Sequence, residues 1–274
     1  MSEKTFRDEL EQTPLDLPRA ALRIAKEIAY PDLEVESYLT RLDQLAGWAD
    51  EIISPIEDIP LQAMALAKFL FRRFGFHGTT AAFSDPRNSY LNDVLDRLFG
   101  IPVSLSLVYL SVADRLGISA GGVGMPGHFI VNVPYADGEV WLDPFHQGRE
   151  LSSQDLTELV QASNAQAEAE PNEERLKKVP PKDILARLLS YLKLVYLRAE
   201  AWDHAQAAIE RLRLLHPENP DYLRDMGYIH DKKGSLRLAV RLYEAYLSRS
   251  PNAVDSEAVR HNLEEAAARL ARLN

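Results

Sequence analysis

The spacing of apolar residues changes at Gly117 from a helical to a β-strand pattern, and this change constrains the fold of the chain more than any other feature of its sequence. Residues 103–116 are apolar nearly all round, which is typical of a central helix packed on several sides. Four glycines then cluster within residues 121–127, and β-rich runs follow at 128–133 and 139–142. This order predicts an α+β domain in which a buried helix leads into an antiparallel hairpin.

Two registers of this hairpin fit the sequence. A two-residue turn at 137–138 puts Asn132 opposite Asp143. A four-residue loop over 134–137 puts His128 opposite Asp143, and we expect this loop because the proline at its start cannot donate to a β-ladder. The two registers differ by an even number of residues. In both of them, therefore, His128, Asn132 and Asp143 share one face of the sheet.

The N-terminal part is expected to be helical from residue 18. Residues 1–17 are acidic and contain Pro14, which indicates a flexible arm. Beyond this arm, apolar residues recur every three or four positions and predict three helices, the last of which ends at Gly75. We expect these helices to form a scaffold around the central helix.

Asp85, Arg87 and Asn88 belong to a turn that precedes a further predicted helix. Either the three side chains line a cleft, or Asp85 and Asn88 cap the helix that follows them. Capping is the commoner role of such residues at such a position.

A repeat of 34 residues organises the C-terminal part. The residue pairs at this spacing include Trp202 and Leu236, Ala205 and Ala239, and Pro217 and Pro251. Thirty-four residues is the length of the tetratricopeptide repeat, a helix-turn-helix unit that stacks on its neighbours. The small residue of the first helix is Gly227 in the second repeat but Lys193 in the first. Leu212 and Tyr246 stand where alanine is usual, and a last helix over 257–273 is expected to cap the stack.

These patterns divide the chain into four parts. We expect a flexible arm at 1–17, an α+β domain at 18–152, a linker at 153–182 and two repeats with a capping helix at 183–274. The linker is acidic and low in bulky residues, and holds at most a short helix near Ser153.

Four motifs of the first domain carry a family resemblance. They are Asp85-Pro-Arg-Asn-Ser-Tyr-Leu, Gly100-Ile-Pro-Val-Ser-Leu-Ser, Gly122-Val-Gly-Met-Pro-Gly-His-Phe and Leu142-Asp-Pro-Phe. With them the chain resembles the SirB1 family over about residues 18–272. The resemblance implies a transglutaminase-like domain of the papain-like superfamily, wrapped by N-terminal helices and followed by an all-α tetratricopeptide-repeat module.

The resemblance also implies a catalytic arrangement, which this chain keeps only in part. In the superfamily a cysteine at the start of the central helix attacks an amide carbonyl, a strand histidine takes its proton, and an aspartate orients that histidine. His128 and Asp143 match the last two roles. The chain contains no cysteine, and Pro102 stands where the family nucleophile is expected. Ser104 is either a substitute nucleophile or a buried hydroxyl bonded to the backbone.

His128 has a structural and a functional interpretation. It is either a buried histidine held by Asp143, or a catalytic or ligand-binding residue whose basicity Asp143 raises. His146 would complete a metal site with these two residues, but two histidines and one carboxylate meet often by chance. We therefore expect no metal and no cofactor. Asn132 is a candidate to line the cleft on the same face.

The composition limits the kinds of molecule that the protein can bind and indicates its location in the cell. A net charge of −10 without a basic stripe argues against nucleic acids and anionic membranes. The polar N-terminus shows no signal segment, and no cysteine is present for disulfide formation. These features indicate a cytoplasmic protein.

The expected function is that of a non-catalytic interaction or regulatory protein on a degenerate transglutaminase-like fold. Its repeats would bind a protein or peptide partner, or would pack on the first domain instead. The bulky Leu212 and Tyr246 favour the second arrangement, because they fill space that a peptide would use. The alternative is an amide or ester hydrolase, or an acyl transferase, that uses Ser104, His128 and Asp143. The sequence leaves the oligomeric state open.

Overall fold

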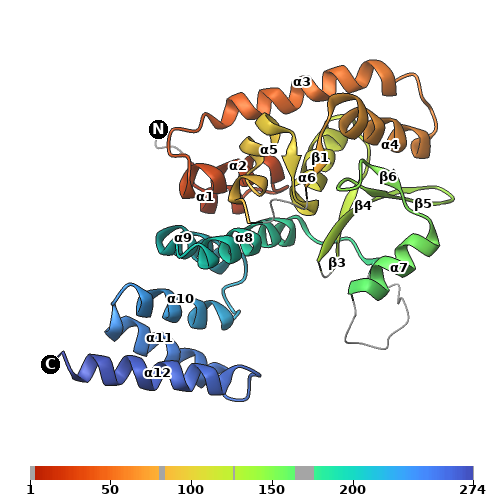
Figure 1. The fold of residues 1–274 in the computed structure, drawn as a ribbon. Coiled ribbons are helices and arrows are strands. Elements are labelled where there is room, and N and C mark those ends of the chain that lie inside the picture. The colour runs from red at the N-terminus through yellow and green to blue at the C-terminus, as the bar shows by residue number, and fades with distance from the viewer. Residues whose placement is uncertain (1–3, 80–83, 126, 164–175, 274) are drawn as a thin grey trace. The chain divides into compact units, whose positions relative to one another are not determined.

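The computed structural model describes residues 4–79, 84–125, 127–163 and 176–273 (Figure 1). The chain divides into two compact units, Met1–Leu188 and Leu189–Asn274. The helix α8, Pro181–Arg198, contributes residues to both units. No helix in the described part of the chain combines the length and the apolar character that a membrane span requires.

The first unit begins with α1, Phe6–Leu10, and not with the expected flexible arm. Thr5 caps this helix, because its side chain accepts from the backbone N–H of Asp8 while the Asp8 carboxylate accepts from the backbone N–H of Thr5. The Phe6 side chain is fully buried. An apolar anchor and a capping box thus fix a segment whose acidic composition suggested disorder.

Three longer helices and a π-helix follow. They are α2, Leu17–Ile28; α3, Val35–Ile53; α4, Ile59–Lys68; and the π-helix η1, Phe69–Phe74. Asp16 and Asp58 cap α2 and α4 through bonds to backbone N–H groups. Gly75 ends η1 with a φ of +103°, a backbone conformation that favours glycine. The predicted N-terminal helices and their end at Gly75 are confirmed.

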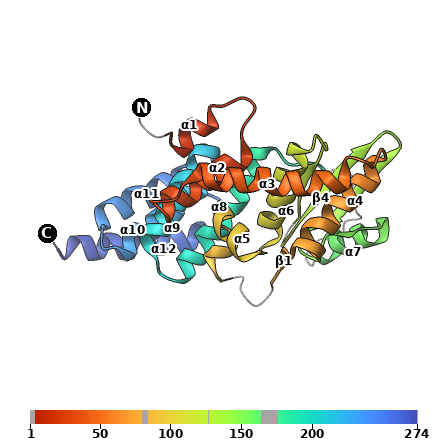
Figure 2. The same ribbon diagram turned by 90° about the horizontal axis from the view of Figure 1, so that it is seen from above.

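The central helix is α6, Pro102–Arg115, and every side chain from Pro102 to Ala113 is buried. It packs against strand β4, His128–Tyr135, and α3 crosses over it (Figure 2). The short elements before it are the 3-10 helix η2, Pro86–Asn88, and α5, Leu91–Arg97. The uniformly apolar pattern of the sequence therefore marked the centre of the first unit.

An antiparallel sheet of four strands packs beside α6. Its order is β3, Gly121–Met125; β4, His128–Tyr135; β5, Gly138–Asp143; and β6, Arg149–Glu150. A separate parallel pair joins β1, His77–Gly78, to β2, Phe99–Gly100, just before the start of α6.

The β4–β5 hairpin has neither of the two expected registers. Tyr135 pairs with Gly138, so the turn consists of residues 136–137, and Pro134 pairs with Glu139 inside the ladder. Hydrogen-bonded and non-hydrogen-bonded pairs alternate in antiparallel ladders, and a two-residue hairpin closes with a hydrogen-bonded pair. Pro134 therefore occupies a non-hydrogen-bonded pair, where its missing N–H costs the hairpin no bond.

The observed register still differs from both expected registers by an even number of residues. Asn132 lies opposite Trp141, and Trp141 and Asp143 point to the same side of β5 because they are two residues apart. His128, Asn132 and Asp143 consequently share one face of the sheet, as the sequence predicted.

The segment after residue 152 packs onto the first unit. Helix α7, Ser153–Ser163, is the short helix expected near Ser153, and its Leu156 and Val160 lie in a buried cluster with Ile130 of β4. Further along, the backbone N–H of Val179 donates to the carbonyl oxygen of Gly122. The first unit thus extends past the expected limit at 152, while the acidic residues 164–175 lie outside the described residues.

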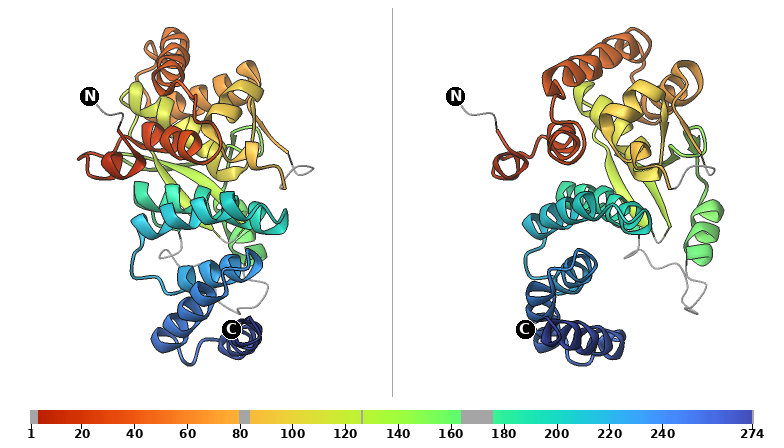
Figure 3. Two further views of the ribbon diagram at one scale, coloured as in Figure 1. Left: turned by 90° about the vertical axis from the view of Figure 1, so that its left-hand side faces the viewer. Right: turned by 60° about the vertical axis from the view of Figure 1, so that its left-hand side comes forward.

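The second unit is a stack of helices (Figure 3). After the last turns of α8 come α9, Trp202–Leu215; α10, Asp221–Lys232; α11, Leu236–Arg249; and α12, Ser256–Ala271. Helices α9 and α11 begin at Trp202 and Leu236, a pair that the 34-residue repeat relates. A Cβ at Gly227 would lie 2.8 Å from the Tyr243 ring, which explains the small residue there.

Candidate functional site

His128 and Asp143 meet at one end of the β4–β5 hairpin. His128 begins β4, Asp143 ends β5, and the His128 Nε2 atom lies 2.9 Å from Asp143 Oδ2. None of the hydrogen bonds between described residues involves the other ring nitrogen of His128, Nδ1. The structure thus brings together the two residues that match the histidine and aspartate roles of the resemblance.

His146 also binds this carboxylate. Its Nδ1 atom lies 2.7 Å from Asp143 Oδ2, and its backbone N–H donates to Asp143 Oδ1 over 3.1 Å. The backbone N–H of Gly148 donates to the carbonyl oxygen of Asp143, so the chain after β5 folds back on itself. We call His128, Asp143 and His146 the His–Asp–His cluster.

The cluster is buried on one side and open on the other. The Asp143 side chain is fully buried, the His128 side chain is 13% exposed, and the His146 side chain is 56% exposed. The Phe145 ring lies edge-on to both imidazoles and against the backbone of Gly78, where a Cβ would come within 2.3 Å of the ring. Solvent therefore reaches the cluster past His146.

Two opposing effects act on the Asp143 carboxyl. Burial raises its pKa, but the hydrogen bond and charge of His128 and then those of His146 outweigh burial, so the pKa lies below its usual value. Asp143 is therefore ionised at neutral pH and can hold both rings through one oxygen.

Ser104 lies away from this arrangement. Its side chain is fully buried, and its hydroxyl donates to the backbone carbonyl oxygen of Asn88 over 2.6 Å. The same hydroxyl accepts from the backbone N–H of Ile101 over 3.0 Å, which caps the start of α6. Among the hydrogen bonds of the described residues, none joins Ser104 to His128. Pro102 supplies the first residue of α6.

The turn at residues 85–88 forms hydrogen bonds with nearby backbone groups and ion pairs with two arginines. Asp85 caps η2 by accepting from the backbone N–H of Arg87, and it forms ion pairs with Arg87 and Arg97. Burial raises the pKa of Asp85, but bonds to Arg87 lower it below its usual value. Asn88 is fully buried and accepts from Arg97. Asp85 thus caps η2, whereas Asn88 does not cap α5, which begins after Tyr90.

Two further residues of the first unit bear on the site. Asn132 is buried on the His128 face, and its amide has no hydrogen-bond partner among the described residues. Arg187 of α8 donates to the backbone carbonyl oxygens of Met125 and His128, and its guanidinium lies 5.5 Å from the centre of the Phe129 ring. No local sequence pattern marks Arg187, because its partners lie about sixty residues earlier in the chain.

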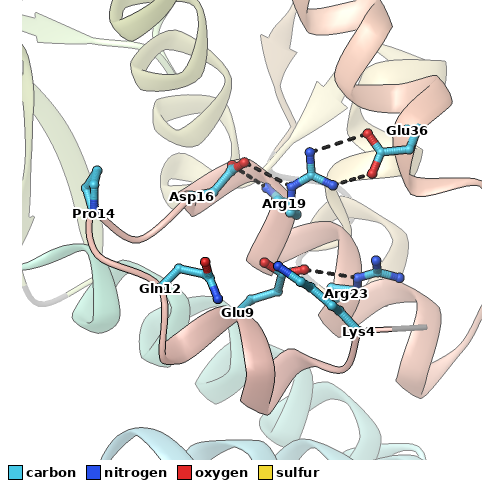
Figure 4. A pocket seen from close by; sticks show the side chains of 8 residues that line it. All are labelled: Lys4, Glu9, Gln12, Pro14, Asp16, Arg19, Arg23 and Glu36. Carbon is cyan, nitrogen blue, oxygen red and sulfur yellow. Dashed lines mark hydrogen bonds and ion pairs between the residues drawn. The ribbon is translucent and has the colours of Figure 1, made fainter. Parts of the chain in front are cut away.

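A cavity of about 430 Å³ lies apart from this cluster, between α1 and the starts of α2 and α3 (Figure 4). Arg19 pairs there with Asp16 and Glu36, and Arg23 pairs with Glu9. The ion pairs on its wall therefore join α1 to α2 and α2 to α3.

Comparison with protein families agrees with this fold. The transglutaminase-like superfamily matches residues 36–190, more than half of the chain, and the tetratricopeptide repeat matches residues 192–264. The fold and these two matches thus define a transglutaminase-like domain followed by a tetratricopeptide-repeat module.

Relatives extend the similarity over most of the chain. A UPF0162 protein of Xylella fastidiosa is 34% identical over 258 residues, which are 93% of this chain and 91% of the relative. A UPF0162 protein of Vibrio cholerae is 26% identical over 87% of each chain. Protein SirB1 of Salmonella typhimurium is 26% identical over 86% of this chain and 88% of its own. The chain belongs to the family of SirB1 and the UPF0162 proteins.

Proposed function

We propose that the protein is a non-catalytic interaction or regulatory protein of the cytoplasm, built on a transglutaminase-like domain without its nucleophile. The hydrogen bonding of the Ser104 hydroxyl is the main support for this proposal. A serine nucleophile must lie within about 3 Å of the base that takes its proton. The Ser104 hydroxyl is instead bonded to the backbone of Asn88 and Ile101, and the chain has no cysteine to replace it.

The retained His128–Asp143 pair favours the alternative, a hydrolase or acyl transferase. A histidine oriented by a buried carboxylate is the arrangement of a general base. A general base alone does not form an acyl-enzyme, however, because the reaction also needs an attacking hydroxyl or thiol. Ser104 would have to give up the cap of α6 to supply one.

A fluorophosphonate probe, which labels reactive serines, tests the proposal. The wild type, Ser104→Ala and His128→Ala proteins would be incubated with the probe at neutral pH, beside a known serine hydrolase as positive control. We expect no labelling of the wild type. Labelling that both substitutions abolish would establish the serine-hydrolase alternative.

The repeats supply the interaction surface of the proposal. Tetratricopeptide repeats generally mediate protein–protein interaction, and stacked repeats offer extended binding surfaces. Leu194, Tyr228 and Leu238 expose apolar side chains on this module. Lys193 forms an ion pair with Asp225 over 2.5 Å, so its charge is used to hold helices of the repeat module together. An apolar segment of a protein partner therefore fits the module better than an acidic peptide.

A photo-crosslinking amino acid at Tyr228 tests this interaction role in cells. We expect a discrete adduct from position 228 and none from His261, an exposed position on α12 that serves as control. The adduct should disappear when Leu194 is replaced by aspartate. Equal adducts from both positions, or adducts unaffected by Leu194→Asp, would contradict a binding role for this surface.

A further inference from the structure

We propose that the His–Asp–His cluster binds one divalent transition-metal ion of the zinc class. The ligand atoms would be His128 Nε2, Asp143 Oδ2 and His146 Nδ1, which all lie within 4.8 Å of one another. The sequence alone led us to expect no metal, because two histidines and one carboxylate meet often by chance. The structure places all three around one point.

The two imidazoles converge on a single oxygen atom. His128 Nε2 and His146 Nδ1 lie 2.9 Å and 2.7 Å from Asp143 Oδ2. A zinc ion takes its nitrogen and oxygen ligands at about 2.0–2.2 Å, so small outward movements of the rings would admit the ion. Each neutral ring would then carry its proton on the opposite nitrogen, leaving a lone pair for the metal.

The protein already holds the carboxylate in the orientation that a metal requires. The backbone N–H of His146 occupies Asp143 Oδ1, which leaves Oδ2 directed between the rings. A ligand oxygen fixed through its second atom is a common feature of metal sites. His128 and Asp143 are further held at the ends of paired strands, and Phe145 packs on Gly78 beside them.

The donor set and the exposure define the class of ion. Two imidazole nitrogens and one carboxylate oxygen suit zinc, cobalt and nickel better than magnesium or calcium. The half-exposed His146 side chain leaves the outer side of the cluster open to solvent. Water would therefore complete the coordination, as in zinc sites with three protein ligands.

Titration of tag-free protein with Co²⁺, followed by visible absorption, tests the proposal. We expect a d–d band that saturates at one Co²⁺ per chain, that one equivalent of Zn²⁺ removes and that Mg²⁺ leaves unchanged. The His146→Ala protein should bind Co²⁺ at least about tenfold more weakly and lose the band. Because His146 is half-exposed, this substitution leaves the core intact, which circular dichroism would verify.

Two further proteins sharpen the result. His128→Gln should weaken Co²⁺ binding as His146→Ala does, whereas His261→Ala, which removes an exposed histidine from α12, should bind like the wild type. Absence of the band in the wild type would overturn the proposal and leave the cluster a hydrogen-bonded link. Equal affinity of wild type and His146→Ala would overturn it as well. Neither outcome bears on the nucleophile, which the fluorophosphonate probe tests separately.

Discussion

The Ser104 hydroxyl donates a hydrogen bond to the backbone carbonyl oxygen of Asn88, over 2.6 Å. This bond joins the start of α6 to the turn at residues 85–88, sixteen residues earlier in the chain. The hydroxyl residue nearest to the expected nucleophile position thus serves as a structural connection.

Ser104→Ala should lower the free energy of unfolding by about 0.5–1.5 kcal/mol, because the Asn88 carbonyl and the Ile101 N–H each lose their shorter hydrogen bond and keep only the 3.3 Å bond to each other. Urea denaturation would measure the change. Ser111→Ala is the matched control: Ser111 is also buried in α6, but among the described residues its hydroxyl bonds only to the Leu107 carbonyl of its own helix. Its effect should be smaller, and equal effects would contradict the role assigned to Ser104.

Gly78→Ala should destabilise the first unit by about 1–3 kcal/mol. The added methyl group would lie 2.3 Å from a Phe145 ring carbon, and displacing the ring strains the core. The ring also contacts His128 and His146, so Co²⁺ affinity should fall in the same protein.

Gly47→Ala supplies the contrast to Gly78→Ala. Nothing lies within 4 Å of a Cβ at this position in α3, so alanine should stabilise the helix by about 0.5–1 kcal/mol. Thermal unfolding of the two variants should therefore shift in opposite directions. A Gly78→Ala protein as stable as the wild type would show that the Phe145 ring is free to move.

Arg187→Met should lower the free energy of unfolding by about 1.5–3 kcal/mol, since two carbonyl oxygens lose a charged donor. The loss should appear as faster amide exchange at Phe129, next to the freed His128 carbonyl. Arg187→Lys should recover only part of the stability, because an ammonium lacks the planar fork of the guanidinium. Full recovery with lysine would mean that the charge alone matters.

His230 should make stability depend on pH. It is buried in α10, its Nδ1 has no hydrogen-bond partner among the described residues, and burial followed by the charge of Lys233 lowers its pKa, while Glu210 opposes this weakly. Below its unfolded pKa of about 6.5 the unfolded chain binds more protons than the folded one. This contribution is therefore present above pH 6.5 and is lost as the pH falls.

Urea denaturation at pH 7, 6 and 5 would reveal this effect. His230→Leu should reduce the loss of stability over this range, whereas replacement of the exposed His261 by alanine should leave it unchanged. An identical pH profile for wild type and His230→Leu would assign the pH dependence to other groups.

The spacing of apolar and repeated residues in the sequence was sufficient to predict most of the fold. The apolar run at 103–116 identified the central helix, and the 34-residue spacing identified Trp202 and Leu236 as equivalent positions, at which α9 and α11 begin. Side-chain alternation placed His128 and Asp143 on one face, because any even shift of register preserves a face.

Features that depend on three-dimensional packing were not predictable. The position of Pro134 inside the ladder depends on which pairs are hydrogen bonded, and composition gave no sign that Phe6 anchors α1. The approach of His146 to Asp143 depends on how the chain folds back after β5, and Arg187 reaches the His128 backbone from a distant helix. No local pattern encodes these contacts.

Helix α8 has a consequence for how this protein can be divided. Its 18 residues run across the boundary at Leu188 and Leu189, so a cut there leaves each fragment with part of a helix. Isolated helices shorter than about 12–15 residues are marginal in water. The transglutaminase-like domain and the repeats therefore cannot be exchanged independently at this boundary. Recombination there would disrupt α8 in both parts, so the two are expected to be inherited together.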